Sequence, residues 1–216
     1  MFTGIIETLG TVTGTRHEGT SIVLFIEPDA DCFDIATGAS VAIDGVCLTL
    51  ETPDRRILQF RAVAETLNHT TLYNIRNGRR VNLERAAMIG QRFDGHLVYG
   101  HVDGVGRITG DREMNGSLIR TVSIPAELSR YMALKGSVAL DGISLTIARS
   151  DAGEISISFI PHTLATTTMA KKRPGDAVNI ECDIVARYLD HLLHGKNRSG
   201  TPSGESLLTI MERSGF

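Results

Sequence analysis

The chain has 216 residues, 42% of them apolar, and its 22 basic and 25 acidic side chains leave a formal net charge of −3. This length fits one large domain or two small ones of about 100 residues each, and the lack of a basic patch argues against a nucleic-acid-binding protein. No apolar stretch reaches the roughly 18 residues of a membrane-spanning helix, and no secretory signal is recognisable at the start, so we expect a cytoplasmic protein with no membrane partner.

Two ten-residue stretches of the chain are closely similar: VAIDGVCLTL at 41–50 and VALDGISLTI at 138–147. The similarity extends well beyond these stretches: residues 41–84 align with 138–181 without a gap, and 16 of the 44 positions are identical. A repeat of this length is a duplicated domain rather than a solenoid unit.

The duplication predicts the domain boundaries. We expect a first domain over 1–96, in which 87–96 form the connection, and a second domain over 97–183. In chain order, each copy contains about six runs rich in β-branched residues and bounded by Gly, Asp or Pro, such as SIVLFIE, ILQFRAV and ISISFI. Six short strands in roughly 90 residues favour a small closed barrel, because closure removes sheet edges.

Helical segments are few. Residues 125–136 predict a short helix, and the T-L-x-x-T-T pattern at 66–72 and 163–169 is either a helical turn or a loop. After the second copy, apolar residues recur at helical spacing, at Ile184, Val185, Tyr188, Leu189, Leu192 and Leu193. With Asp183 as an N-cap and Gly195 at the C-terminal end, we expect a helix over 184–195 that packs on the barrels or joins subunits, and we favour oligomerisation. The composition of 196–216 predicts a flexible tail.

The expected fold class is therefore all-β, with two tandem similar small closed barrels followed by a C-terminal helix. The repeated motif D-G-[V/I]-[C/S]-L-T adds a chemical pattern. Asp-Gly predicts a tight turn, after which Cys47 or Ser144 shares a strand face with Thr49 or Thr146. Such a face binds a ligand or simply faces water.

Metal and cofactor motifs are absent. The three cysteines, Cys32, Cys47 and Cys182, have no C-x-x-C spacing, which favours reduced thiols over a disulfide framework or a zinc site. His191 and His194 are three residues apart, but no third ligand accompanies them. The sequence also lacks dinucleotide-binding and phosphate-binding loops.

Seven stretches occur in a characteristic order along the chain: MFTGIIE, GASVAIDGVCLTL, VNLERA, DGHLVYGHVD, KGSVALDGISLTI, FIPHTL and VNIECD. Together they resemble riboflavin synthase of the α-chain type, over about residues 1–195. The resemblance implies dismutation of two molecules of 6,7-dimethyl-8-ribityllumazine. A four-carbon unit moves from one to the other, giving riboflavin and 5-amino-6-(D-ribitylamino)uracil. It implies no cofactor, no metal, a homotrimer and, as a further partner, lumazine synthase.

The resemblance also implies the ligand-binding positions. The first pocket is expected to contain Gly4, Ile5, Ile6, Cys47, Leu48, Thr49, Glu65 and Thr66. The second is expected to contain Gly100, His101, Val102, Lys135, Ser144, Leu145, Thr146, Ile160, Pro161, His162 and Thr163. Phe2 is expected either to stack on the ligand as a lid or to pack internally.

The candidates for catalysis are His101, Ser144 and Asp183, where the two copies diverge, together with Cys47 in the first copy. Asp183 is equally explained as a helix cap, His96 is expected to be structural, and no single general base is assigned. The alternative function is that of the lumazine proteins, which bind a lumazine or flavin as an optical antenna without catalysis. A flavin-binding barrel of a reductase is weaker, because no nicotinamide domain follows.

Overall fold

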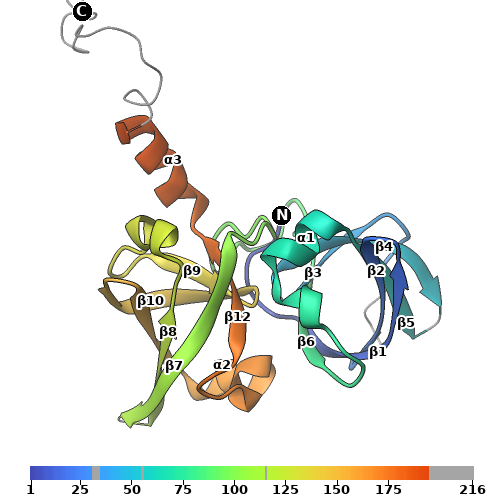
Figure 1. The fold of residues 1–216 in the computed structure, drawn as a ribbon, viewed down its shortest axis with the longest axis horizontal. Coiled ribbons are helices and arrows are strands. Elements are labelled where there is room, and N and C mark those ends of the chain that lie inside the picture. Colours follow the sequence, from blue (N-terminus) through green and yellow to red (C-terminus); the bar gives the residue numbers. More distant parts are fainter. Residues whose placement is uncertain (31–34, 55, 115, 195–216) are drawn as a thin grey trace, which may run out of the picture. The chain divides into compact units, whose positions relative to one another are not determined.

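The computed structural model describes residues 1–30, 35–54, 56–114 and 116–194 (Figure 1). Cys32, Gly195 and the predicted flexible tail lie outside these residues. Residues 1–184 form one compact unit, which contains both barrels, and the remaining described residues, 185–194, belong to a second unit.

Six antiparallel strands close the first barrel in the order β1-β2-β5-β4-β3-β6. The strands are β1 Thr8–Glu18, β2 Ser21–Pro28, β3 Ser40–Ile43, β4 Val46–Asp54, β5 Ile57–Ala62 and β6 Arg80–Arg85. Between β5 and β6 lie the short helix α1, Ala64–His69, and the 3₁₀ helix η1, Thr71–Asn74. The pattern at 66–72 is therefore helical.

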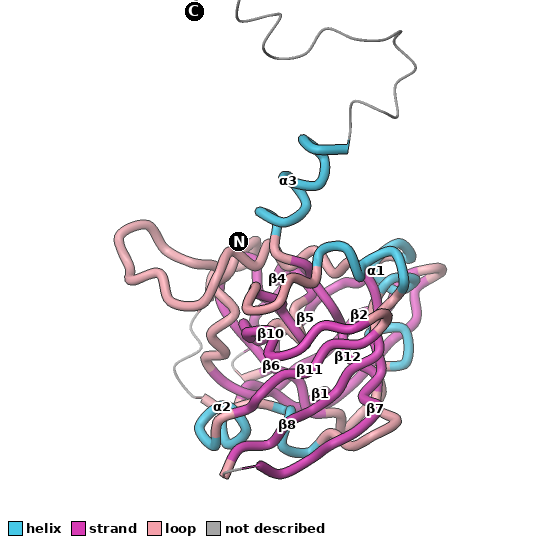
Figure 2. Tube along the Cα trace, turned by 90° about the vertical axis from the view of Figure 1, so that its left-hand side faces the viewer, coloured by secondary structure: helices cyan, strands magenta, loops and turns pink. Residues whose placement is uncertain are grey.

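The second barrel repeats this arrangement in the order β7-β8-β11-β10-β9-β12. Its strands are β7 Gly104–Met114, β8 Ser117–Ser123, β9 Ser137–Leu140, β10 Ile143–Asp151, β11 Glu154–Phe159 and β12 Ala177–Cys182. Its helical segments are η2 Ala126–Tyr131, α2 Pro161–Thr166 and η3 Thr168–Lys171. The predicted pair of closed barrels is confirmed, and Figure 2 shows how little of the two barrels is helical.

Alternation along each strand builds the two cores. On β11, Ile155, Ile157 and Phe159 are at most 1% exposed and point into the second barrel. Each such side chain contributes about 1.5–3 kcal/mol of transfer free energy when it is fully buried. On β4, Leu48 and Leu50 point inward. The side chains between them therefore lie on the outer face of the barrel.

The two Asp-Gly turns meet each other. Asp44-Gly45 and Asp141-Gly142 each join two strands with positive φ at both residues, as a two-residue type I′ hairpin requires. A Cβ on Gly45 would lie 2.6 Å from the amide nitrogen of Gly142, and a Cβ on Gly142 would lie 2.7 Å from that of Gly45. The repeated Asp-Gly thus forms the contact between the barrels.

Two buried asparagines complete this contact reciprocally. The side chain of Asn82 donates to the carbonyl of Asp141 (2.9 Å), and that of Asn179 donates to the carbonyl of Asp44 (2.8 Å). The carboxylates of Asp44 and Asp141 each accept a backbone N–H at 2.8 Å, from Asn82 and Asn179 of their own barrels. Burial, and then the Asp141 charge, raise the pKa of Asp44 to about 6. This interface is polar, buried and paired at each of these groups.

The predicted C-terminal helix is present as α3, Ile184–His194. Along it, Val185, Tyr188, Leu189, Leu192 and Leu193 are each more than half exposed. Among the described residues, no helix is both long and apolar enough to cross a membrane.

Candidate functional site

The segments that precede the barrels are exchanged between them. The amide of Ser144 donates to the carbonyl of Gly4 (2.8 Å), and the amide of Cys47 donates to the carbonyl of Gly100 (2.9 Å). The side chains agree, since Val102 packs against the core of the first barrel and Ile6 against that of the second. The expected grouping of residues 4–6 with Cys47 and of 100–102 with Ser144 is therefore wrong.

The exchange has a physical cause in two buried glutamates. Glu84 on β6 accepts from the amide and hydroxyl of Thr3 and from the amide of Gly4, at 2.7, 2.8 and 3.0 Å. Glu181 on β12 accepts from the amides of Tyr99 and Gly100, at 2.7 and 3.1 Å. Each carboxylate holds one edge of the segment that enters its own barrel, so that the other edge faces the neighbouring barrel.

Burial of these glutamates also shifts their ionisation. Burial raises the pKa of Glu84, although the hydrogen bonds from Thr3 and Gly4 act in the opposite direction. Burial also raises the pKa of Glu181, to about 7. The two glutamates occupy equivalent positions in the repeat and are identical in it, which is the sequence signal that could have found them.

A cavity of about 370 Å³ lies over the outer face of the first barrel. It is lined by Val46, Cys47, Glu65, Thr66, His69, Thr70, Gly100, His101, Val102 and Asp103. Six of these ten were predicted from the sequence, including Cys47 and His101, while Val46, His69, Thr70 and Asp103 were missed. His69 pairs with Glu65 one helical turn away (Nε2–Oε1 3.2 Å), a spacing that the sequence of α1 contains.

The equivalent face of the second barrel carries a serine–histidine pair. Nδ1 of His96 lies 2.7 Å from Oγ of Ser144. His96 is 8% exposed, and its Nε2 has no hydrogen-bond partner among the described residues. Burial lowers the pKa of His96, although the charge of Asp183 opposes this, so the imidazole is held neutral beside the hydroxyl.

This pairing changes the interpretation of His96. From the sequence we expected His96 to be structural. The structure places it, rather than His101, against Ser144. A neutral imidazole in contact with a hydroxyl can accept its proton, which makes the pair suited to acid–base chemistry.

Lys135 has an unusual backbone. Its φ is +65°, in the left-handed region, and its amide donates to the carbonyl of Ile147. The equivalent position in the first copy is Gly38, with φ +87° and the same hydrogen bond, to Leu50. A lysine in this conformation costs roughly 1–2 kcal/mol that glycine avoids. Strain of this kind concentrates at functional sites, which supports the predicted ligand contact.

Other predicted residues are distributed between surface and core. Phe2 is fully buried against Val98 and bonded to it through both backbone amides, so its role as a lid is wrong and its packing alternative is correct. Leu48 and Leu145 point into the barrel cores, which leaves only their backbones to face a ligand. The surface set comprises Ile5, Thr49, Thr146, Ile160, Pro161 and His162, all exposed, with Thr163 half-buried. Among the described residues, no cluster of His, Cys, Asp and Glu is arranged to hold a metal.

Comparison with known proteins agrees with the pair of barrels. The lumazine binding domain matches the chain twice, over residues 3–86 and 99–183. Solved structures of LumP complexed with 6,7-dimethyl-8-(1′-D-ribityl) lumazine and with riboflavin superpose with TM-scores of 0.76 and 0.78. They are 21% and 22% identical in sequence, and each comparison covers 84% of this chain and at least 98% of the other. The chain is thus a member of the class of proteins with two tandem lumazine-binding domains.

Relatives of higher identity narrow this class. The riboflavin synthase of Bacillus subtilis (strain 168) is 37% identical over 93% of this chain and 94% of its own length. That of Brucella abortus (strain 2308) is 42% identical over 89% and 98%, and that of Actinobacillus pleuropneumoniae is 35% identical over the full length of both. The chain belongs to the riboflavin synthase family.

Proposed function

We propose that this protein converts two molecules of 6,7-dimethyl-8-ribityllumazine into riboflavin and 5-amino-6-(D-ribitylamino)uracil. The observation that carries this proposal is the duplicated outer face, in which a Cys47–Gly100 contact and a Ser144–Gly4 contact present the same backbone arrangement twice. A reaction between two copies of one compound needs two similar binding faces. Holding both copies removes much of the entropic cost of their encounter.

The chemistry requires loss of a proton from the 7-methyl group of the donor and addition of a nucleophile to the acceptor ring. We assign the proton-handling role on the second barrel to Ser144 and His96, with Asp183 acting on the imidazole through its charge. Cys47 and His101 are the corresponding candidates on the first barrel, where both line the cavity. The exposed backbone and hydroxyl groups around them suit the ring edge and the ribityl chain.

We further propose that the protein acts as a homotrimer in the cytoplasm. Support comes from α3, whose exposed apolar side chains would be covered in subunit contacts, and from Cys47, which forms no disulfide with any residue that the structure describes. The residues lining the first cavity include none of Ser144, His96 or Lys135. The two ligands are therefore proposed to face each other across a subunit boundary, with lumazine synthase as a further partner.

One assay tests the proposal against the antenna alternative, in which the protein binds a lumazine or flavin without turning it over. The purified protein is incubated with 6,7-dimethyl-8-ribityllumazine in a chelating buffer, and riboflavin is followed by its absorbance. We expect one riboflavin for every two lumazines consumed. Tight binding without riboflavin formation would establish the antenna function instead.

A further inference from the structure

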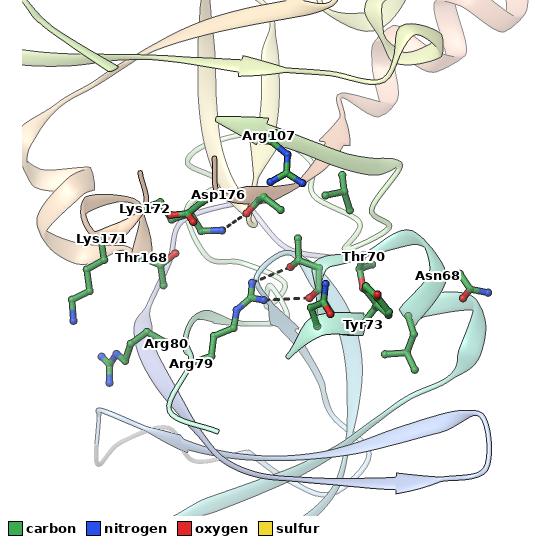
Figure 3. Close-up of a pocket in the computed structure, with 15 residues that line it drawn as sticks. Asn68, Thr70, Tyr73, Arg79, Arg80, Arg107, Thr168, Lys171, Lys172 and Asp176 are labelled. Carbon is green, nitrogen blue, oxygen red and sulfur yellow. Dashed lines mark hydrogen bonds between the residues drawn. The ribbon is translucent and has the colours of Figure 1, made fainter. Parts of the chain in front are cut away.

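A second cavity, of about 800 Å³, lies between the barrels and is separate from the one beside Cys47 (Figure 3). Its walls come from both copies of the repeat: Leu67, Asn68, Thr70, Thr71, Tyr73, Asn74, Arg79, Arg80, Val105, Arg107, Thr168, Lys171, Lys172, Asp176 and Ala177. Only Thr70 also lines the smaller cavity. The volume is in the range of pockets that enclose a small organic ligand.

Five of the lining residues are cations, and the buried carboxylates account for only some of them. Arg79 pairs with Asp44 at 3.1 Å and Lys172 with Asp141 at 2.5 Å. Arg80 pairs with Asp29 outside the cavity. Asp176 is the one acid in the lining. The two remaining cations give the cavity an excess of positive charge.

Arg107 and Lys171 are these remaining cations, and both are exposed. Arg107 donates to the carbonyl of Gly175, while the charge of Lys171 acts on Asp29, the carboxylate that already pairs with Arg80. Their counterparts in the repeat, Thr11 and Asn74, are neutral. Because one copy does without these charges, the barrel itself does not require them.

A buried hydroxyl also lacks a partner at this surface. Thr168 is 4% exposed, and its Oγ1 has no hydrogen-bond partner among the described residues. Its repeat counterpart Thr71 also lines the cavity, and there the hydroxyl accepts from Arg79 at 3.0 Å. Figure 3 shows Thr168 on the wall that also carries Lys171 and Lys172. A buried hydroxyl left unpaired is unfavourable, and a bound hydrogen-bond acceptor would remove this penalty.

Aromatic and apolar side chains also line the cavity, and Figure 3 shows Tyr73 on the side away from Lys171 and Thr168. Tyr73 is 67% exposed and Val105 39% exposed, although side chains of this kind are usually covered. Leu67 and Asn68 adjoin them in the lining. An exposed ring beside an amide is suited to stack on a planar ring and to hydrogen-bond with its edge.

From these walls we infer that the cavity is a binding site for a nucleotide-like ligand, in which a planar ring carries a phosphate. The phosphate lies between Arg107 and Lys171, where charge-assisted hydrogen bonds favour it, and also accepts from Thr168. The ring lies on Tyr73. This site is independent of the one proposed for the lumazine.

Calorimetric titration of the full-length protein with adenosine 5′-monophosphate tests the inference. Adenosine and inorganic phosphate serve as half-ligands, each carrying one of the two recognised groups. We expect the nucleotide to bind at least about 10-fold more tightly than either, the equivalent of about 1.4 kcal/mol for each lost set of contacts, and to weaken in high salt. Equal binding of phosphate alone, or no binding of the nucleotide at millimolar concentration, overturns the site.

Matched variants locate the binding. Arg107→Glu with Lys171→Glu should weaken nucleotide binding by at least about 10-fold, and Tyr73→Ala should bring the affinity close to that for phosphate. Arg149→Glu, which reverses an exposed charge on the second barrel outside this cavity, is the control. Riboflavin formation should stay unchanged in the charge-reversed protein, so that failure here leaves the proposed reaction intact. Unchanged nucleotide affinity in that protein, or displacement of the nucleotide by riboflavin, refutes the inference.

Discussion

Gly45 and Gly142 touch backbone to backbone, each occupying the space that a side chain on the other would need. Their turns belong to the same repeated motif as Cys47 and Ser144. The motif therefore does two things at once: its first half fixes one barrel against the other, and its second half faces outward as the candidate binding surface.

Gly45→Ala should be strongly destabilising, because the methyl group would meet backbone rather than a movable side chain. We expect a loss of more than about 3 kcal/mol in the free energy of unfolding, measured in urea. Gly19→Ala is the matched control, since Gly19 also has a positive φ but no atom within 4 Å of an added Cβ. It should lose only about 1–2 kcal/mol, and equal losses would show that the contact between the turns is unimportant.

Ser144→Ala and His96→Gln should each reduce turnover by about 10-fold or more without unfolding the protein. Cys47→Ser, which only converts one copy toward the other, should be milder. The rate should fall as the pH drops through the pKa of His96, which burial places below its ordinary value of 6.5, because only the neutral ring accepts a proton. A pH profile of His96→Gln that keeps this acid limb would remove His96 from the mechanism.

Lys135→Gly should make the protein more stable and less able to bind ligand. Glycine relieves the left-handed strain but also gives the unfolded chain more conformational freedom. The free energy of unfolding, measured in urea, should therefore rise by about 0.5–1 kcal/mol. A fluorescence titration with riboflavin should show weaker binding. The reciprocal change, Gly38→Lys, should destabilise by a similar amount and leave binding as it was. If Lys135→Gly binds riboflavin normally, the strained lysine has no ligand role.

Glu181 should make stability depend on pH. Its pKa is raised in the folded protein from 4.5 to about 7, so the folded state holds the proton more tightly than the unfolded state. Its contribution is fully present below pH 4.5 and is lost as the pH rises through about 7. Relative to Glu181→Gln, the native protein should lose about 3 kcal/mol across this window. If the free energies of unfolding of the two proteins changed with pH in the same way, the raised pKa of Glu181 would be contradicted.

Assembly and catalysis should fail together when the exposed face of α3 is made polar. Leu189→Ser with Leu193→Ser removes two large apolar side chains from that face without shortening the chain. Sedimentation should show species smaller than a trimer, and riboflavin formation should be lost. As a control, Arg187→Ser in the same helix leaves these leucines in place. Retention of a fully active trimer by the doubly substituted protein would exclude α3 as the assembly element.

Much of the fold could be predicted because the repeat doubles every signal. Strand alternation, Asp-Gly turns and glycines at equal offsets all appear twice, and both barrels followed from them. The C-terminal helix lies outside the repeat and was predicted from the helical spacing of its own apolar residues. Six of the ten residues that line the cavity beside Cys47 could be predicted, but the grouping of the segments could not. Nothing in the spacing of Gly4 and Cys47 shows that the segment at Gly4 crosses to Ser144, since that depends on which edge Glu84 holds.

His96 was missed for a related reason. Its contact with Ser144 joins positions 48 residues apart, and no local spacing pattern predicts such a contact. The wide cavity between the barrels was also invisible in the sequence, because its charges come from positions that the repeat does not share.

The reciprocal bonds of Asn82 and Asn179 carry one more consequence. Each barrel donates the same side-chain hydrogen bond to the other, as the two subunits of an isologous dimer do. A single ancestral barrel of this kind would have been self-complementary. It would have paired with an identical copy, and the segment before its first strand would have bound to that copy. Fusion of the two genes would then have freed each half to change alone, which is how one copy could acquire a serine with a histidine beside it while the other kept a cysteine.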